Sequence, residues 1–243
     1  MAGVGCSACP LRRFRIFTPF TPGELAFQQD FKSGELTADP RTTLLMEGSN
    51  APQLFTVLSG MGVRYKTLEN GRRQVISFVL PGDFLGLQAG VMGEMRHSVK
   101  ATTRMRLCVF RREDLWRLFQ AQPARAYDLT WLGAIEEHLL GETIVTLGQR
   151  DTTQRIAWAF YKLFRRLRAV GLGDPRGVPL PFRQQDLADA LGLSLVHTNK
   201  TLKRLAAAGL AVWSRGRLEL ADPAALAAIG LVDHHRPERR PLV

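Results

Sequence analysis

The stretch Leu193 to Leu205, LSLVHTNKTLKRL, mixes apolar residues with side chains that can bind polar partners. On a helix, at about 100° per residue, these residues sort into two opposed stripes. The inward stripe holds Thr198, Leu202 and Leu205, with Thr201 at its edge; the outward stripe holds Val196, Asn199, Lys200 and Lys203. Apolar, amide and ammonium groups on one exposed face can contact base edges and phosphates in a DNA groove.

The preceding residues, RQQDLADALGLS, predict a helix and a sharp turn that would position this face. Leu187 and Leu191 point inward, and Ala188 is small where a crossing helix must come close. Gly192 permits the turn, and Ser194 can cap the second helix. This pattern indicates a helix-turn-helix, whose second helix enters the major groove while the first crosses the phosphate backbone. The alternative is a pair of ordinary packed helices with a solvated cationic face.

The charge of the chain favours a polyanionic partner. The formal net charge is +11, and residues 151–220 contain twelve Lys and Arg against five Asp and Glu. Nucleic acid is the expected partner for such a segment. No apolar run approaches the roughly 18 to 20 residues of a spanning helix, and the first residues lack the apolar core of a signal peptide. We therefore expect a cytoplasmic protein without a membrane partner.

Residues 35–112 read as short strands separated by glycine turns, which predicts an antiparallel β-sheet domain. Asn70-Gly71 lies between two extended runs and predicts a type I′ hairpin turn, in which both residues have positive φ. Residues 113–148 are expected to form a helical linker and a long helix, Ala124 to Leu147, with apolar residues over a broad arc. Such an arc suits packing on the chain's own β-domain and on a second copy; the alternative is packing within one chain only.

The rest of the chain is predicted to form a small DNA-binding domain and a tail. Asp151 is the expected N-cap of the helix that leads into residues 149–222, whose order of helix, helix, helix and hairpin is typical of a winged helix-turn-helix. Residues 1–34 form an N-terminal arm with a cysteine pair, and residues 223–243 form a tail that we expect to be partly disordered.

From Cys6 to Asp222 the chain resembles the Crp/Fnr family of transcription regulators. The resemblance rests on the order of the elements, on LPGDFLG in the β-domain and on RQQDLADALGLSLVHTNKTLKRL in the helix-turn-helix. It implies an α+β fold with an N-terminal antiparallel β-roll, a long dimerisation helix and a C-terminal winged helix-turn-helix. It also implies a homodimer that binds a palindromic site in double-stranded DNA and recruits or blocks RNA polymerase.

Two departures from cyclic-AMP-binding members of the family concern the effector. Those members carry Glu directly after the last Gly of the LPGDFLG motif, and an Arg-Ser pair some residues later. Here the positions read Leu87 and His97-Ser98. Leucine cannot accept a hydrogen bond from a ribose hydroxyl, and a neutral histidine cannot replace a bidentate guanidinium on phosphate. We therefore do not expect this chain to bind a cyclic nucleotide.

The recognition helix departs from the family as well. Many relatives use a Glu and an Arg for base contacts, where this chain has Val196 and Lys200, with Asn199 beside the latter. Valine can touch a thymine methyl and asparagine can pair with adenine, so we expect these three residues to read the bases of a different half-site. We assign contacts to the DNA backbone to Arg183, Gln184, Gln185, Ser194, His197, Lys203 and Arg204.

The three cysteines are Cys6, Cys9 and Cys108. Their positions resemble the oxygen-sensing Fnr branch, whose members hold a [4Fe-4S] cluster with N-terminal cysteines and one β-roll cysteine. That branch has a third N-terminal cysteine, which is missing here, so the resemblance implies three iron-sulfur ligands where four are usual. The alternatives are a thiol redox pair, or cysteines without a cofactor, with Cys108 as an apolar filler.

The hypothesis that follows is a site-specific DNA-binding transcription regulator whose signal is sensed by the β-roll and the N-terminal arm. Redox state or oxygen is the candidate signal. The alternative from another class is a small-molecule-binding β-roll protein whose basic C-terminal part docks on an acidic protein or lipid. We find no nucleophile-and-base motif and no complete metal set, and do not expect an enzyme.

Overall fold

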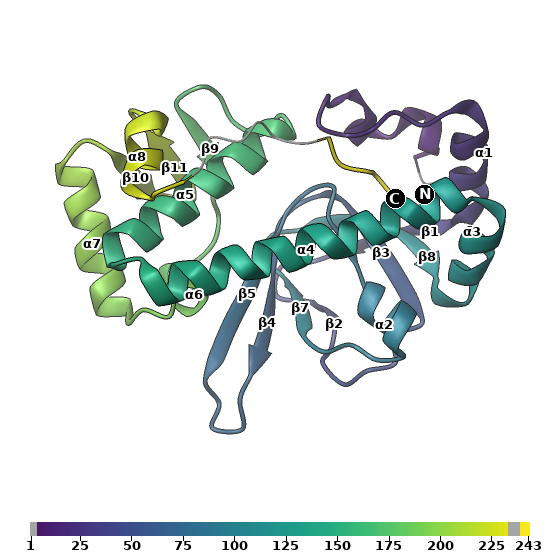
Figure 1. The fold of residues 1–243 in the computed structure, drawn as a ribbon, viewed down its shortest axis with the longest axis horizontal. Helices are drawn as coiled ribbons and strands as arrows, with labels where there is room; N and C mark the ends of the chain where they lie inside the picture. The colour runs from purple at the N-terminus through teal and green to yellow at the C-terminus, as the bar shows by residue number, and fades with distance from the viewer. Residues whose placement is uncertain (1–3, 233–238) are drawn as a thin grey trace. The chain divides into compact units, whose positions relative to one another are not determined.

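The computed structural model describes residues 4–232 and 239–243 of the chain. They fall into two units that are described separately here, with elements labelled as in Figure 1. The first unit comprises Met1–Lys66, Ser77–Glu137 and Glu238–Val243, and the second comprises Thr67–Ile76 and His138–Pro237. The fold class is the predicted one: an α+β chain with an antiparallel β-roll, a long helix and a winged helix-turn-helix.

The β-roll consists of two four-stranded sheets with the strand orders β1-β8-β3-β6 and β2-β7-β4-β5. Its strands are β1 (Lys32–Ala38), β2 (Thr43–Leu45), β3 (Gln53–Ser59), β4 (Gly62–Thr67), β5 (Arg73–Val79), β6 (Phe84–Leu85), β7 (Ser98–Ala101) and β8 (Met105–Arg111). The core between them includes Val57, Val99 and Leu107, none of which is exposed to solvent. On the first sheet, β8 pairs with β1 and β3, which places Cys108 opposite Glu35 and Thr56.

Helices of the first unit lie before, between and after the strands in sequence. They are the 3-10 helices η1 (Cys6–Ala8), η2 (Pro10–Arg13) and η3 (Arg112–Asp114), and the α-helices α1 (Pro22–Phe31), α2 (Leu87–Met92), α3 (Leu115–Ala121) and α4 (Pro123–Gln149). α1 begins at a capping box in which Thr21 and Glu24 satisfy each other's backbone N–H groups. The predicted long helix is α4, which continues beyond Glu137 into the second unit.

The turn between β4 and β5 differs from the predicted type I′ turn. Gly71 has a positive φ of 79°, but Asn70 is not among the residues with positive φ. The N–H of Gly71 bonds to the carbonyl oxygen of Leu68, and the N–H of Leu68 bonds to that of Arg72. This is the pattern of a three-residue hairpin loop closed by a glycine bulge, so only the glycine adopts the left-handed conformation.

The second unit contains the winged helix-turn-helix. Its elements beyond α4 are α5 (Thr152–Ala169), β9 (Gly177–Pro179), α6 (Gln184–Leu191), α7 (Leu195–Ala207), β10 (Ala211–Ser214), β11 (Arg217–Leu220) and α8 (Pro223–Ile229). The three strands form one sheet in the order β10-β11-β9. Asp151 caps α5 as predicted, because its carboxylate accepts the N–H groups of Thr153 and Gln154 at 2.7 and 2.9 Å.

The expected tail, residues 223–243, is more ordered than its composition suggests. Residues 223–229 form α8, which Asp222 caps and which buries Leu226 and Ala227 against the unit. Residues 239–243 pack on the first unit, and residues 233–238 lie outside the described part of the chain. Alanine and leucine at helical spacing favour α8. The prediction of a partly disordered tail rested on the polar residues that follow this helix.

Candidate nucleic-acid interface and cysteine pocket

The predicted helix-turn-helix is formed by α6 and α7. Gly192 has a φ of 62° at the end of α6, a conformation that glycine adopts without strain. The hydroxyl of Ser194 accepts the N–H of His197 at 3.2 Å and caps α7. Leu187, Ala188 and Leu191 are buried as predicted. The turn and the cap therefore fix the direction in which α7 leaves α6.

The two stripes predicted for α7 are present in the structure. Thr198, Thr201 and Leu205 are at most 4 % exposed, and the Thr198 hydroxyl bonds to the carbonyl oxygen of Ser194 at 3.0 Å. On the opposite stripe Val196 is 75 % exposed, Lys200 and Lys203 are exposed, and Asn199 is half-buried. A valine this exposed has no packing role within the chain, so the outward stripe is a surface available to a partner.

Several residues predicted to touch the DNA backbone also have partners within the unit. The Arg183 guanidinium lies 3.0 Å from Asp186, and the amide of Gln185 donates to Asp189 at 2.6 Å. The Arg204 guanidinium donates to the hydroxyl of Thr153 on α5. Gln184, His197 and Lys203 are exposed. The sequence had not indicated these intramolecular bonds, which hold the cationic side chains at the surface of the motif.

Asp186 connects the start of α6 to two arginines. Its carboxylate bonds to Arg183 and, at 2.6 Å, to Arg73, which also reaches Asp189 at 2.7 Å. Burial raises the pKa of Asp186, but the hydrogen bonds from the two guanidinium groups outweigh burial and lower it. The carboxylate therefore stays ionised and keeps its hydrogen bonds to Arg183 at the start of α6.

One half-buried arginine holds the ends of two helices. The Arg155 guanidinium donates to the carbonyl oxygens of Leu147 at 2.7 Å, Arg150 at 2.8 Å and Leu191 at 3.1 Å. Leu147 and Leu191 lie in the last turns of α4 and α6, and Arg150 directly follows α4, so no helical N–H is available to these carbonyl groups. Arg155 thus satisfies both helix ends, a role that its place in a helix-forming run did not reveal.

The hairpin between β10 and β11 forms the wing. Its two-residue turn has φ of 48° at Arg215 and 73° at Gly216, which is a type I′ geometry. The Arg215 side chain is exposed at the tip. The Trp213 indole donates to the carbonyl oxygen of Leu180 at 2.9 Å and meets Phe160 edge-on at 5.7 Å, which attaches the wing to α5. Arg215 is a candidate phosphate ligand that was not among the predicted DNA contacts.

The interior of the β-roll contains a buried arginine. Arg64 is 7 % exposed, donates to Glu136 of α4 at 2.6 Å and donates to the carbonyl oxygen of Phe84 at 3.0 Å. Nearby, burial and the positive charge of Arg64 lower the pKa of His97 to about 4. The hydroxyl of Ser98 accepts the N–H of Glu47 at 3.0 Å. Ser98, at one of the positions aligned with the family's phosphate-binding pair, therefore has a partner within the roll.

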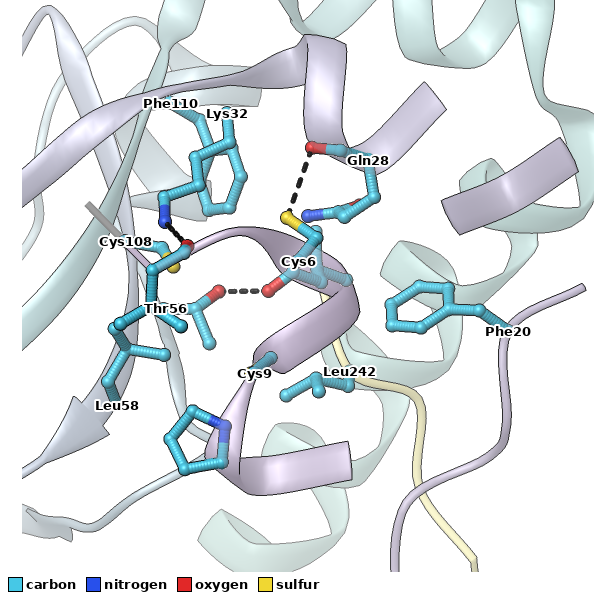
Figure 2. Close-up of a pocket in the computed structure, with 13 residues that line it drawn as sticks. Cys6, Cys9, Phe20, Gln28, Lys32, Thr56, Leu58, Cys108, Phe110 and Leu242 are labelled. Atoms are coloured by element: carbon cyan, nitrogen blue, oxygen red, sulfur yellow. Dashed lines mark hydrogen bonds between the residues drawn. The ribbon is translucent and has the colours of Figure 1, made fainter. Parts of the chain in front are cut away.

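The three cysteines line one pocket, to which the N-terminal arm and the first sheet both contribute. In Figure 2 the sulfur of Cys6 points to the carbonyl oxygen of Gln28, at 3.7 Å. The ammonium of Lys32 lies in the same pocket and bonds to the carboxylate of Glu35 at 2.7 Å. The fold thus brings together cysteines that are about a hundred residues apart, as the resemblance to the Fnr branch implied.

The pocket does not fit an iron-sulfur cluster in the arrangement described. Among residues 4–232 and 239–243, no three Cys, His, Asp or Glu side chains gather closely enough to hold a metal ion. Burial raises the pKa of Cys6 and raises that of Cys108 to about 12, so both are neutral thiols at pH 7 when no metal is bound. The iron-sulfur cluster stays a prediction.

Comparison with known sequences identifies both units. A family model described as a cyclic nucleotide-binding domain matches residues 35–122, and one described as a Crp-like helix-turn-helix domain matches residues 154–229. In the part of the chain that the structure describes, no helix combines the length and apolarity needed to cross a membrane.

Similar proteins extend over almost the whole chain. The nitrogen fixation regulation protein FixK of Bradyrhizobium diazoefficiens is 30% identical over 230 residues, which cover 92% of this chain and 93% of FixK. The transcriptional activatory protein AadR of Rhodopseudomonas palustris is 30% identical, covering 76% of each chain. The solved structure of FixK2 from Bradyrhizobium japonicum has a TM-score of 0.74 at 24% identity and covers 83% of this chain and 98% of that one. The relatives are named as regulators and not as enzymes. The chain therefore belongs to the Crp/Fnr family of DNA-binding transcription regulators.

Proposed function

We propose that this regulator binds a palindromic site in double-stranded DNA as a homodimer, with α7 in the major groove. The observation that carries the proposal is the outward stripe of α7. Val196, Asn199 and Lys200 would read base edges, because valine, amide and ammonium groups match the methyl, hydrogen-bonding and acceptor groups that bases present there. The Ser194 cap of α7 and the turn at Gly192 support this placement, because they fix the direction of the helix that carries the three residues.

Contacts to the phosphates would hold α7 in its register. Lys203 and His197 are exposed on α7, Gln184 is exposed at the start of α6, and Arg215 is exposed at the wing tip. Arg183, Gln185, Ser194 and Arg204 keep exposed side chains beside their internal bonds and complete the proposed set. Such contacts bind every sequence alike and depend on salt, so they position the dimer without selecting its site.

The second copy would pack on α4. Leu140, Ile144 and Val145 are 45, 70 and 48 % exposed, which is unusual for aliphatic residues on one helix. At Gly141 and Gly148 a Cβ would meet no atom within 4 Å, so a partner helix could approach closely there. In a two-fold dimer the two recognition helices would read half-sites about one helical turn apart.

The signal would be sensed by the first unit, at the β-roll and the N-terminal arm that form the cysteine pocket, and redox state or oxygen is the candidate signal. The internal Arg64–Glu136 pair and Leu87 support the view that no cyclic nucleotide is the effector. The output would be recruitment or exclusion of RNA polymerase in the cytoplasm, the compartment in which a bacterial regulator meets DNA.

Selection of bound DNA from a random pool, with reduced and with oxidised protein, tests this function. We expect an enriched palindrome with half-sites one turn apart, resistant to competitor DNA at physiological salt. Binding to all sequences alike, or binding only to acidic protein or anionic vesicles, would support the docking function instead. Anaerobic purification with iron and sulfide analysis decides separately whether a cluster is bound.

A further inference from the structure

The segment of residues 239–243, Arg-Arg-Pro-Leu-Val, occupies its own groove on the first unit. Arg240 forms a parallel β-bridge with Phe17: its N–H donates to the carbonyl oxygen of Ile16 at 2.8 Å, and its carbonyl oxygen accepts the N–H of Thr18 at 2.9 Å. The Arg240 guanidinium pairs at 3.1 Å with Asp83, whose side chain is almost fully buried. A strand added to the edge of the N-terminal arm is a recurring mode of peptide recognition.

The groove uses the LPGDFLG motif. A Cβ added at Gly82 would collide with the ring of Phe17, and Gly82 has a φ of 89°, so only glycine leaves room for the ring. Phe17 is 4 % exposed. The next residue, Asp83, supplies the carboxylate that binds Arg240. In this chain, Gly82 thus makes room for Phe17 of the N-terminal arm, and Asp83 binds Arg240 of the 239–243 segment.

Two further buried side chains hold the apolar end of the segment. The hydroxyl of Thr56 donates to the carbonyl oxygen of Val243, and the guanidinium of Arg125 donates to that of Leu242. Thr56 and Arg125 are each 2 % exposed, and Leu242 and Val243 are each 4 % exposed. If the segment left, buried donors would lose partners and apolar surface would be exposed, so the groove is built for an occupant.

The segment also closes the cysteine pocket. Leu242 and Val243 line this pocket together with Cys6, Cys9 and Cys108. In Figure 2, Leu242 lies beside Cys9, and Thr56, which bonds to Val243, lines the same pocket. Cys6 and Cys108 are 7 and 8 % exposed with the segment in place.

We propose that residues 239–243 are an intramolecular ligand of the first unit, and that their release opens the cysteine pocket to reagents in solution. The occupant is the segment of the same chain, which the groove holds through Ile16, Asp83, Thr56 and Arg125. The inference deepens the proposed sensing at this pocket but rests on neither DNA binding nor dimerisation, so a failure of the DNA selection would leave it standing.

The test is the rate at which N-ethylmaleimide modifies Cys6 and Cys108 in the full chain, read by peptide mass spectrometry. Arg240→Ala removes the pair with Asp83, and Thr56→Val removes the bond to Val243. Arg239→Ala is the matched control, because Arg239 is the adjacent and exposed arginine. We expect both cysteines to react about tenfold faster in the first two variants and at the parent rate in the control, since loss of these bonds favours local opening.

A variant that lacks residues 239–243, checked by circular dichroism for folding, provides a second measurement. The free peptide Arg-Arg-Pro-Leu-Val should restore protection of both cysteines, and a scrambled peptide should not. Equal rates in Arg240→Ala, Thr56→Val and the parent would overturn the proposal. Protection of the parent that falls on dilution would overturn its intramolecular form and indicate exchange of the segment between copies.

Discussion

Arg64 of β4 and Glu136 of α4 form an ion pair of 2.6 Å inside the β-roll unit. The guanidinium is buried, while the Glu136 side chain is 41 % exposed. Burial alone would lower the pKa of Arg64, but the charges of Glu136 and Asp83 and the hydrogen bond to Glu136 together outweigh burial and raise the pKa. The pair thus attaches the middle of α4 to β4, a strand within the region that matches a cyclic nucleotide-binding domain.

Loss of this carboxylate is expected to destabilise the first unit. Glu136→Gln leaves the buried guanidinium without its counter-charge, and we expect the free energy of unfolding to fall by about 1 to 3 kcal/mol, less than for a fully buried pair. Glu137→Gln is the control, because Glu137 is the neighbouring exposed glutamate. Urea unfolding of both variants measures the difference; equal midpoints would show that the pair does not contribute.

The pKa of His97 predicts how stability depends on pH. Burial, and then the charge of Arg64, lower the pKa to about 4. The imidazole therefore takes up a proton at a lower pH in the native state than in the unfolded state. The stabilising effect is complete above pH 6.5 and is lost as the pH falls towards 4, by on the order of 3 kcal/mol. In His97→Gln the urea midpoint should change less between pH 7 and pH 4.5 than in the parent, whereas in His138→Gln it should change as in the parent. A parent-like slope in the His97 variant would contradict the prediction.

Lys200 and Lys203 are expected to differ in their effect on DNA binding. Lys200→Ala should weaken binding to the selected site by about 1 to 3 kcal/mol and relax its sequence preference, because the ammonium would contact a base. Lys203→Ala should weaken binding to all sequences alike and reduce the slope of log affinity against log salt by about 1. Fluorescence anisotropy at several salt concentrations measures both. Identical losses on selected and random DNA in the two variants would remove the distinction.

The wing tip is expected to bind a phosphate. Arg215→Asn removes the charge while retaining a residue that tolerates positive φ, so the hairpin should survive. We expect weaker binding to every sequence and a shallower salt dependence, with Arg215→Lys close to the parent. The same anisotropy titration provides the measurement, and an unchanged salt slope in Arg215→Asn would exclude the wing tip from the interface.

The exposed face of α4 predicts the oligomeric state. Ile144→Asp places a charge in the proposed contact between two copies, and we expect a monomer in light scattering coupled to gel filtration. Val91→Asp is the matched control, since Val91 on α2 is 67 % exposed and Ile144 is 70 % exposed. A dimer that persists in Ile144→Asp would place the second copy elsewhere.

Local signals carried most of the sequence analysis. The stripes of α7, the cap at Ser194, the glycine turn before it and the cap at Asp151 all depend on residues within a few positions of one another, so they could be predicted. The Asn70-Gly71 turn was predicted wrongly in detail because two hairpin geometries place glycine after asparagine and differ only in the φ of the asparagine.

Contacts between distant parts of the sequence could not be predicted. Arg64 and Glu136 are 72 residues apart, and Arg240 and Asp83 are 157 apart. Nothing near Arg240 distinguishes it from the other basic residues of a polar tail, and only the folded arm and sheet supply its partners. The convergence of Cys6 and Cys108 was implied by the family resemblance; their raised pKa values follow from burial that the sequence does not show.

The three hydrogen bonds of Arg155 have a consequence for hydrogen exchange. Because one guanidinium bonds to Leu147, Arg150 and Leu191, the last turn of α4 and the last turn of α6 share a single anchor. Neither turn can fray without loosening the bonds that hold the other. Their amide protons should therefore exchange with deuterium in one cooperative event, and Arg155→Lys should separate that event into two.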